Sequence, residues 1–273
     1  MATYNRLSQF RYKYLRKLCG SAIYAELAIA CGGVWNRTEL ENLIDGKQYG
    51  EYTGRYRKMC NGTIPYETNC KNIQNQLEVN QNHKCSIIKW RELPLWRLLS
   101  FLQPDTEDIK YTLLTIKGET RNYIWDVFPE EEQFKYLFSR KPYSKNYFES
   151  VAQLNNFEAL LTLTAWAREA RGFKDYSSHK YCAKYSRKIF AHAVCNTPQL
   201  FIRWPILYQY YIEPIWSLYS NTDLKELKIS EVQDEIYEEE KTARLKGVQL
   251  PPKKVFREIN KSDIKLCLNR SLH

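Results

Sequence analysis

Hydrophobic residues recur at helical spacing along most of the chain. Small and apolar side chains do so over residues 18–31, and the two glycines that follow favour a left-handed end to this helix. Asn36 is a suitable N-cap for the next helix, and Glu39 three residues later completes a capping box. That helix should end at Gly46 and bury a stripe made of Leu40, Leu43 and Ile44.

Helical patterns continue through the first part of the chain. A short basic helix is expected before Gly62, where an Asn-Gly pair stops it. The next helix should have one apolar face, formed by Cys70, Ile73 and Leu77. An amphipathic helix then begins at Pro94, carries leucines at i, i+3, i+4 and i+7, and halts before Pro104.

The later part of the chain shows one mixed region and several helical ones. The alternating, β-branched segment near 109–116 allows at most a short strand. The other patterns are helical. They predict a helix begun at Pro129, a core helix over 151–170, a helix over 177–195, an aromatic helical stretch over 201–219 kinked at Pro205 and Pro214, and a charged helix over 223–246.

These patterns predict a mainly α fold built from two packed helical lobes. A chain of 273 residues is long enough to bury a substantial core in each lobe. The first lobe would comprise residues 1–103 and contain a helix-turn-helix-like unit. The second would comprise residues 104–273 and carry the long charged helix and a basic tail.

A series of short motifs in the first lobe supports the expectation of a helix-turn-helix-like unit. A basic turn with Tyr56, Arg57 and Lys58 is followed by Gly62 and Pro65, and by the triplet Pro94-Leu95-Trp96. This order resembles a loosely defined group of uncharacterised bacterial proteins whose first segment is similar to phage-repressor helix-turn-helix domains. The resemblance implies a bacterial DNA-binding regulator, or an accessory subunit of a mobile-element or anti-phage defence system.

The distribution of charge points to an acidic partner. The chain has a formal net charge of +10. Residues 1–20 contain five bases and no acid, whereas residues 231–240 contain six acids and no base. Such a balance favours a nucleic acid, an anionic membrane surface or an acidic protein as partner.

Two basic segments are the candidate nucleic-acid-binding surfaces, for either DNA or RNA. Both combine bases that contact phosphate with tyrosines that stack or dock against sugar. The first consists of Arg55, Tyr56, Arg57 and Lys58. The second lies on one face of the expected helix 177–195, at i, i+4, i+7 and i+8, and consists of Lys180, Lys184, Arg187 and Lys188. Tyr176, Tyr181 and Tyr185 are interleaved with these bases.

Two alternatives stay open beside nucleic-acid binding. In the first, the protein is a component of a multi-subunit complex, and the aromatic segment 201–219 and the acidic segment 231–240 dock a protein partner. In the second, it is a toxin or nuclease-like effector whose catalytic residues are dispersed in the sequence. Enzymatic activity is thus undecided, with a non-catalytic role favoured.

Known catalytic and metal-binding patterns do not identify a site. His179 and Cys182 pair at one end of an expected helix, and His192 and Cys195 at the other. Cys182 and His192 are ten residues apart, about 15 Å on a continuous helix, which is too far for one zinc ion. A phosphate-binding loop and a nucleophile elbow are also missing from the sequence. We therefore expect no catalytic residues, bound metal or cofactor.

Cysteine spacing suggests a reducing compartment, and hydropathy gives no sign of a cleaved leader or a membrane span. The eight cysteines are irregularly spaced in a chain much larger than a disulfide-stapled domain, so we expect free thiols in a cytoplasmic protein. The basic start followed by residues 18–31 looks like a leader, but Glu26 interrupts its apolar run, and no cleaved leader is expected. No stretch approaches the roughly 18 apolar residues of a membrane span, so no membrane partner is expected.

Overall fold

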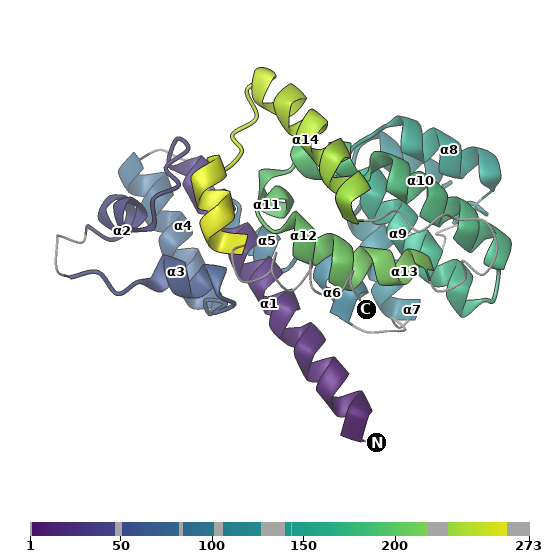
Figure 1. Ribbon diagram of the computed structural model, residues 1–273, viewed down its shortest axis with the longest axis horizontal. Helices are drawn as coiled ribbons and strands as arrows, with labels where there is room; N and C mark the ends of the chain where they lie inside the picture. The colour runs from purple at the N-terminus through teal and green to yellow at the C-terminus, as the bar shows by residue number, and fades with distance from the viewer. Residues whose placement is uncertain are drawn as a thin grey trace. The chain divides into compact units, whose positions relative to one another are not determined.

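The computed structural model describes the backbone of residues 2–46, 51–81, 84–100, 106–126, 140–142, 144–217 and 229–260. Helices make up almost all of the regular structure, which confirms the mainly α prediction (Figure 1). Within the described residues, β pairing is limited to one isolated antiparallel bridge between Trp125 and Arg140. None of the helices described has the combination of length and apolar composition that crossing a membrane requires.

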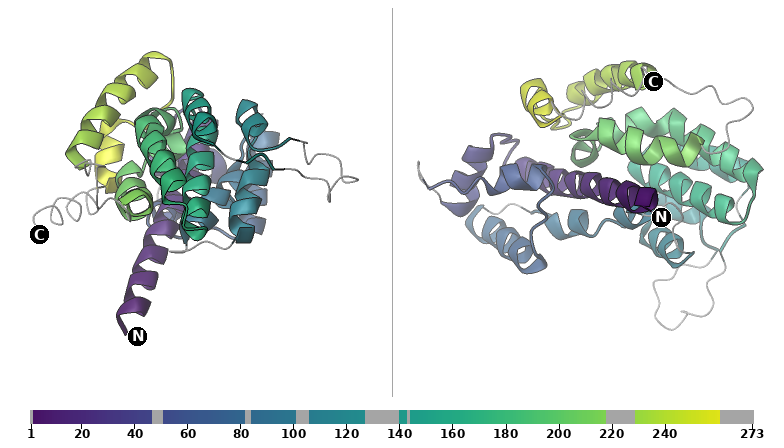
Figure 2. Two further views of the ribbon diagram at one scale, coloured as in Figure 1. Left: turned by 90° about the vertical axis from the view of Figure 1, so that its right-hand side faces the viewer. Right: turned by 60° about the horizontal axis from the view of Figure 1, so that its bottom comes forward.

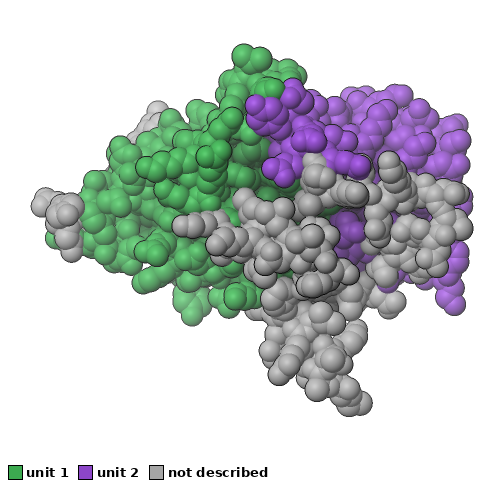
Figure 3. Space-filling view, in the orientation of Figure 1, with its two compact units in different colours: residues 1–96, 197–210, 240–273 green, residues 97–196, 211–239 purple. Residues whose placement is uncertain are grey.

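The chain divides into two compact units, which Figure 3 colours separately. Unit 1 contains residues 1–96, 197–210 and 240–273, and unit 2 contains residues 97–196 and 211–239. Each unit is therefore assembled from segments that are distant in the sequence. The boundary expected between residues 103 and 104 lies outside the described residues.

Unit 1 is organised by α1 (Ala2–Ala30), which is one unbroken helix in Figures 1 and 2. Its residues from 14 to 28 are largely buried, and it contacts α3 (Arg55–Cys60), α5 (Ile87–Arg91) and α11 (Pro198–Phe201). The remaining helical elements of unit 1 are α2 (Arg37–Asp45), α4 (Glu67–Gln81), the start of α6 (Pro94–Ser100), α12 (Trp204–Leu207), the end of α14 (Ile229–Leu245) and residues 253–260.

The local signals at the ends of α1 and α2 act as expected. Gly32 and Gly33 follow α1 with φ of 73° and 87°, and Asn36 accepts hydrogen bonds from the backbone of α2. The expected stripe on α2 is wrong at one position, because Leu43 is 44% exposed. Leu40 and Ile44 are buried, and the buried face turns toward Glu41 rather than Leu43, since Glu41 bonds to the segment before α3.

Helices α1 and α3 approach so closely that their backbones touch. A Cβ atom added at Gly20 would overlap the carbonyl oxygen of Met59. Next to this contact, the Ser21 hydroxyl donates to the carbonyl of Cys60 at 3.4 Å. The glycine in the middle of α1 is thus required by packing, which offsets its low helix propensity.

A buried arginine fixes the later segments to this centre. The Arg203 side chain is 1% exposed and lies between α11 and α12. Its guanidinium donates to the Ser21 hydroxyl at 3.1 Å, to the Cys60 carbonyl at 2.7 Å and to the Ile259 carbonyl at 2.6 Å. One side chain therefore joins α1, α3 and the segment 253–260.

Unit 2 has α9 (Phe157–Gly172) at its centre. This helix pairs along its length with α10 (Tyr176–Cys195), and both contact α8 (Lys145–Gln153), as Figure 1 shows. Most of the α9 side chains from 159 to 170 are buried. The other elements of unit 2 are the end of α6, α7 (Thr106–Thr115), the 3-10 helix η1 (Glu119–Tyr123), α13 (Glu213–Ser217) and the start of α14.

One sequence expectation is met and another fails in unit 2. The segment near 109–116, where the sequence allowed at most a short strand, forms no strand: residues 109–115 belong to α7, their apolar residues fit an i, i+4 helical face, and acids in the first turn suit the helix dipole. The helix expected over 151–170 is broken, because Asn155 adopts φ 47° and Asn156 caps α9 by accepting from the Ala159 amide at 2.8 Å.

Other expectations for the later chain are met or lie outside the described part. The stretch 201–217 is helical but interrupted, with α12, a π-helical turn (Tyr208–Ile212) and α13 following one another. Helix α14 corresponds to the expected charged helix from residue 229 onward. The helix expected from Pro129, the halt at Pro104 and the tail after 260 fall outside the described residues.

Candidate nucleic-acid-binding surfaces

Three lysines form a stripe on the exposed face of α10. Lys180, Lys184 and Lys188 are all exposed and follow one another at i+4 spacing. At 1.5 Å per residue the stripe extends about 12 Å along the helix. Tyr176, one turn before Lys180, is 50% exposed and continues the same row. We call these three lysines the α10 stripe.

The position of the stripe follows from the packing of α10. Asp175 caps the helix by accepting from the Ser178 amide at 3.0 Å. Hydrogen bonds from the Ser178 side chain, and then from the Ser178 amide, lower the pKa of the Asp175 carboxyl. The opposite face is buried against α9 and contains His179, Cys182 and Phe190. The lysines are thus left on the side away from α9.

Arg187, expected to belong to the stripe, packs inside unit 2. It is 8% exposed, and its guanidinium lies 5.9 Å from the centre of the Trp216 ring. Its helical angle matches that of Lys180, but α13 contacts α10 and covers this side of it. Angular spacing alone predicts that Arg187 is exposed like Lys180. Arg187 is buried because it lies further along α10, where α13 packs against the helix.

The turn between α9 and α10 adds Phe173, an exposed ring that the sequence patterns missed, next to the predicted Tyr176. Phe173 is 68% exposed, and the next residue, Lys174, adopts a left-handed φ of 60°. Together with Tyr176 they place two exposed rings and a base beside the start of the α10 stripe. The one available signal was Gly172, which precedes them and marks the end of α9.

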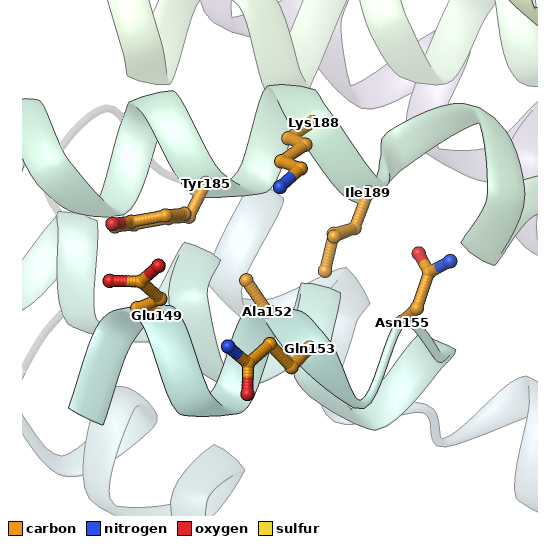
Figure 4. A pocket seen from close by; sticks show the side chains of 7 residues that line it. All are labelled: Glu149, Ala152, Gln153, Asn155, Tyr185, Lys188 and Ile189. Carbon is orange, nitrogen blue, oxygen red and sulfur yellow. The ribbon is translucent and has the colours of Figure 1, made fainter. Parts of the chain in front are cut away.

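A groove of about 240 Å³ lies between α8 and α10 (Figure 4). In Figure 4 the Tyr185 hydroxyl points toward Glu149, and Lys188 and Ile189 extend from α10 toward α8. Burial, and then the charge and hydrogen bond of Glu149, raise the pKa of Tyr185. Lys188 belongs to both the α10 stripe and the groove, which is lined by Glu149, Ala152, Gln153, Asn155, Tyr185, Lys188 and Ile189.

The second predicted surface, on α3, is only partly exposed. Arg57 and Lys58 face solvent. Tyr56 is fully buried, and its hydroxyl accepts a hydrogen bond from Arg55 at 2.9 Å. Arg55 also pairs with Asp45 at 2.6 Å. The expectation that Tyr56 stacks on a ligand is therefore wrong, because its ring is buried in the core of unit 1.

An exposed tyrosine that the sequence patterns missed lies beside this surface. Tyr66, directly before α4, is 79% exposed. It borders a hollow of about 210 Å³ between α3 and α4, and Lys58 and Arg55 lie on the same rim. The signal for it was the Pro65-Tyr66 pair at a helix start, where a side chain projects before the first turn.

Glu41 holds the chain that leads into α3. Its carboxylate is 2% exposed and accepts hydrogen bonds from the Thr53 amide at 2.8 Å, the Thr53 hydroxyl at 2.7 Å and the Gly54 amide at 3.0 Å. Burial opposes its ionisation, but these hydrogen bonds and nearby Arg55 outweigh burial and lower the pKa of Glu41. The start of α3 is thus fixed from α2.

The pair α2 and α3 differs in geometry from a helix-turn-helix motif. Residues 46–54 separate the two helices, whereas the motif uses a turn of about three or four residues. Helix α3 spans only Arg55–Cys60, little more than one turn and a half. Its bases therefore sit on a helix that extends only about 9 Å.

The histidine–cysteine pairs lie at the two ends of one helix. Helix α10 is continuous from Tyr176 to Cys195, so the turn that a shared zinc site would need between the pairs is not formed. The ring of His179 bonds to the Ala167 carbonyl at 2.9 Å, and that of His192 contacts Glu239 at 2.9 Å. Within the described residues, no cluster of three potential ligands is close enough to hold a metal ion.

The two expected protein-docking segments have different exposure. The aromatic side chains from 201 to 216 are buried, with Trp204 at 5%, Tyr211 at 2% and Trp216 at 1% exposure. They form cores and cannot serve as a docking surface, which corrects that part of the expectation. The acidic segment on α14 is more open, and Asp234, Glu235, Tyr237 and Glu238 are exposed.

Comparisons with protein-family models, with curated proteins and with solved structures found no match to this chain.

Proposed function

We propose that the protein binds nucleic acid and that the α10 stripe contacts the phosphate backbone. The observation that carries this proposal is the row of Lys180, Lys184 and Lys188 on one exposed helix face. The sequence has no acid between residues 176 and 188. Lysine contacts with phosphate release counterions, and this release supplies most of the affinity in binding that does not depend on base sequence.

The dimensions of the stripe suit a nucleic-acid strand. Its length of about 12 Å corresponds to roughly three or four steps of a stacked strand at about 3.4 Å per step. Phe173 and Tyr176 offer rings for base stacking at one end. At the other end Lys188 leads into the groove against α8, where Asn155 and Gln153 supply amide groups.

The test is fluorescence anisotropy with duplex DNA, single-stranded DNA and RNA over a series of salt concentrations. The stripe variant is Lys184→Ala/Lys188→Ala. The matched control is Lys110→Ala/Lys117→Ala, which removes two exposed lysines of the same unit and gives the same net charge. The stripe variant should reduce the slope of log K against log salt by about 1.8 for duplex or about 1.4 for single strands.

The control variant should change the slope little, because its lysines lie on α7 and after it, away from α10 in the sequence. Equal slopes for both variants would show that only net charge matters and would contradict a defined stripe. A wild-type protein that binds none of the three probes at moderate salt would overturn the proposal.

A second candidate function is docking of a basic protein partner on α14. The observation in its favour is Tyr237, which is 48% exposed among Asp234, Glu235 and Glu238. Burial, and then the charge of Glu231, raise the pKa of Glu235, so this face is crowded with negative charge that a basic partner would relieve. A protein partner that stays bound after nuclease treatment and is lost in Tyr237→Ala would favour this function.

A further inference from the structure

We propose that the hollow beside Tyr66 in unit 1 holds one unpaired base of a single-stranded nucleic acid. This inference rests on the proposed function and specifies the class of nucleic acid. In it, the Tyr66 ring stacks on the base, and Lys58 contacts the adjoining phosphate.

The hollow has the size and lining for a single planar ring. Its walls come from α3, α4 and the turn between them, and include Met59, Ile64, Pro65 and Ile73. Its volume is about 210 Å³, compared with about 150 Å³ for a protein cavity known to hold benzene. One base fits such a space, whereas a base pair does not.

Tyr66 is held in a position to cover an occupant of the hollow. Its carbonyl accepts a hydrogen bond from the Cys70 amide at 3.0 Å in the first turn of α4, so its backbone is fixed. Its side chain lines the hollow and is 79% exposed, so much of the ring is open to contact. Stacking of a base on such a ring is a main source of affinity for single strands.

The charge around the hollow selects an anionic occupant. Lys58 lines the hollow and is exposed on α3. The nearby carboxylates are already paired, Asp45 with Arg55 and Glu67 with Lys71, each at 2.6 Å. A planar ring attached to a negative group satisfies both the apolar hollow and the basic rim, and a nucleotide is such a ligand. Bases of a duplex are stacked and paired, so an unpaired base is required.

Hydrogen bonds fix the turn between α3 and α4, which lines the hollow through Thr63, Ile64 and Pro65. Gly62 in the turn after α3 has φ of 100°, and its carbonyl accepts from the Arg16 side chain of α1 at 3.1 Å. The Thr63 amide donates to the Lys58 carbonyl at 2.9 Å. A preformed site of this kind loses little conformational entropy on binding.

The test compares binding of a short oligothymidylate, the matching oligouridylate and a blunt DNA hairpin. Tyr66→Ala should weaken binding of the single strands by roughly five- to a hundredfold, and binding of the hairpin by less than about twofold. Tyr66→Phe keeps the ring and should stay within about twofold of wild type. Tyr111→Ala, which removes another exposed tyrosine, is the control.

A direct readout locates the base. Photo-cross-linking with an oligonucleotide that carries iodouracil should attach to Tyr66 or to its neighbours in the hollow, as identified by mass spectrometry. Lys58→Ala should reduce the salt slope for single strands by about 0.7. The two strand types show whether the site accepts DNA, RNA or both.

The outcomes separate this inference from the proposed function. If Tyr66→Ala binds single strands as tightly as wild type, the base site is wrong, while binding that depends on Lys184 and Lys188 leaves the proposed function standing. If wild type binds neither single strands nor the hairpin, both are wrong.

Discussion

At the scale of single residues, the missing side chain of Gly20 allows α1 and α3 of unit 1 to approach closely. Because a Cβ at this site overlaps the Met59 carbonyl, Gly20→Ala must push α3 away from α1. We expect the variant to lose about 1–3 kcal/mol of unfolding free energy, the usual cost of overpacking, although alanine is the better helix former. Urea unfolding followed by circular dichroism measures this loss.

Gly172 provides the matched control. It is the last residue of α9, and a Cβ added there meets no other atom within 4 Å. Gly172→Ala should therefore change stability by less than about 1 kcal/mol, in the stabilising direction. Equal effects of the two substitutions would mean that the close approach of α1 and α3 does not exist in solution.

At the scale of secondary-structure elements, Glu41 links α2 to the start of α3. Glu41→Gln removes a charge that accepts three hydrogen bonds from Thr53 and Gly54, and at neutral pH it should cost about 1.5–3 kcal/mol. Since the folded protein lowers the pKa of Glu41, the stabilisation is fully present above the unfolded pKa of about 4.3.

The stabilisation by Glu41 is lost as the pH falls through the lowered pKa, because the carboxyl is then protonated in both states. The difference in unfolding free energy between wild type and Glu41→Gln should thus shrink between neutral and strongly acidic pH. Urea titrations at a series of pH values measure it. A difference that stays constant with pH would show that the ionised carboxylate does not hold the loop.

Element boundaries could be predicted where the signal is local, and failed where distant packing decides. Asn36 and Gly46 bound α2 as expected, because a cap depends only on the adjoining turn. By contrast, the burial of Arg187 depends on α13, and that of Tyr56 on the helices around it. The α10 stripe was largely readable from spacing on one helix, whereas the Tyr66 hollow needs α3 and α4 to be placed together.

At the scale of the whole molecule, unit 1 depends on two segments that come after the first part of unit 2 in the sequence, residues 197–210 and residues 240–260. Helix α11 is among the main contacts of α1, and Arg203 reaches Ser21, Cys60 and Ile259. Hydrophobic periodicity cannot predict these contacts, because the residues concerned are far apart in the sequence. The first lobe as expected from the sequence, residues 1–103, therefore lacks part of its own core.

A fragment of residues 1–103 consequently should not fold as an independent domain. Without Arg203 the Ser21 hydroxyl and Cys60 carbonyl lose their buried donor, and the apolar face that α11 covers on α1 becomes exposed. We expect helix content without a cooperative thermal transition in circular dichroism, and binding of a hydrophobic dye. The full chain is the control and should melt cooperatively. A cooperative transition of the fragment would show that α1, α3 and α5 form a sufficient core, and that segments 197–210 and 240–260 only dock onto a domain already complete.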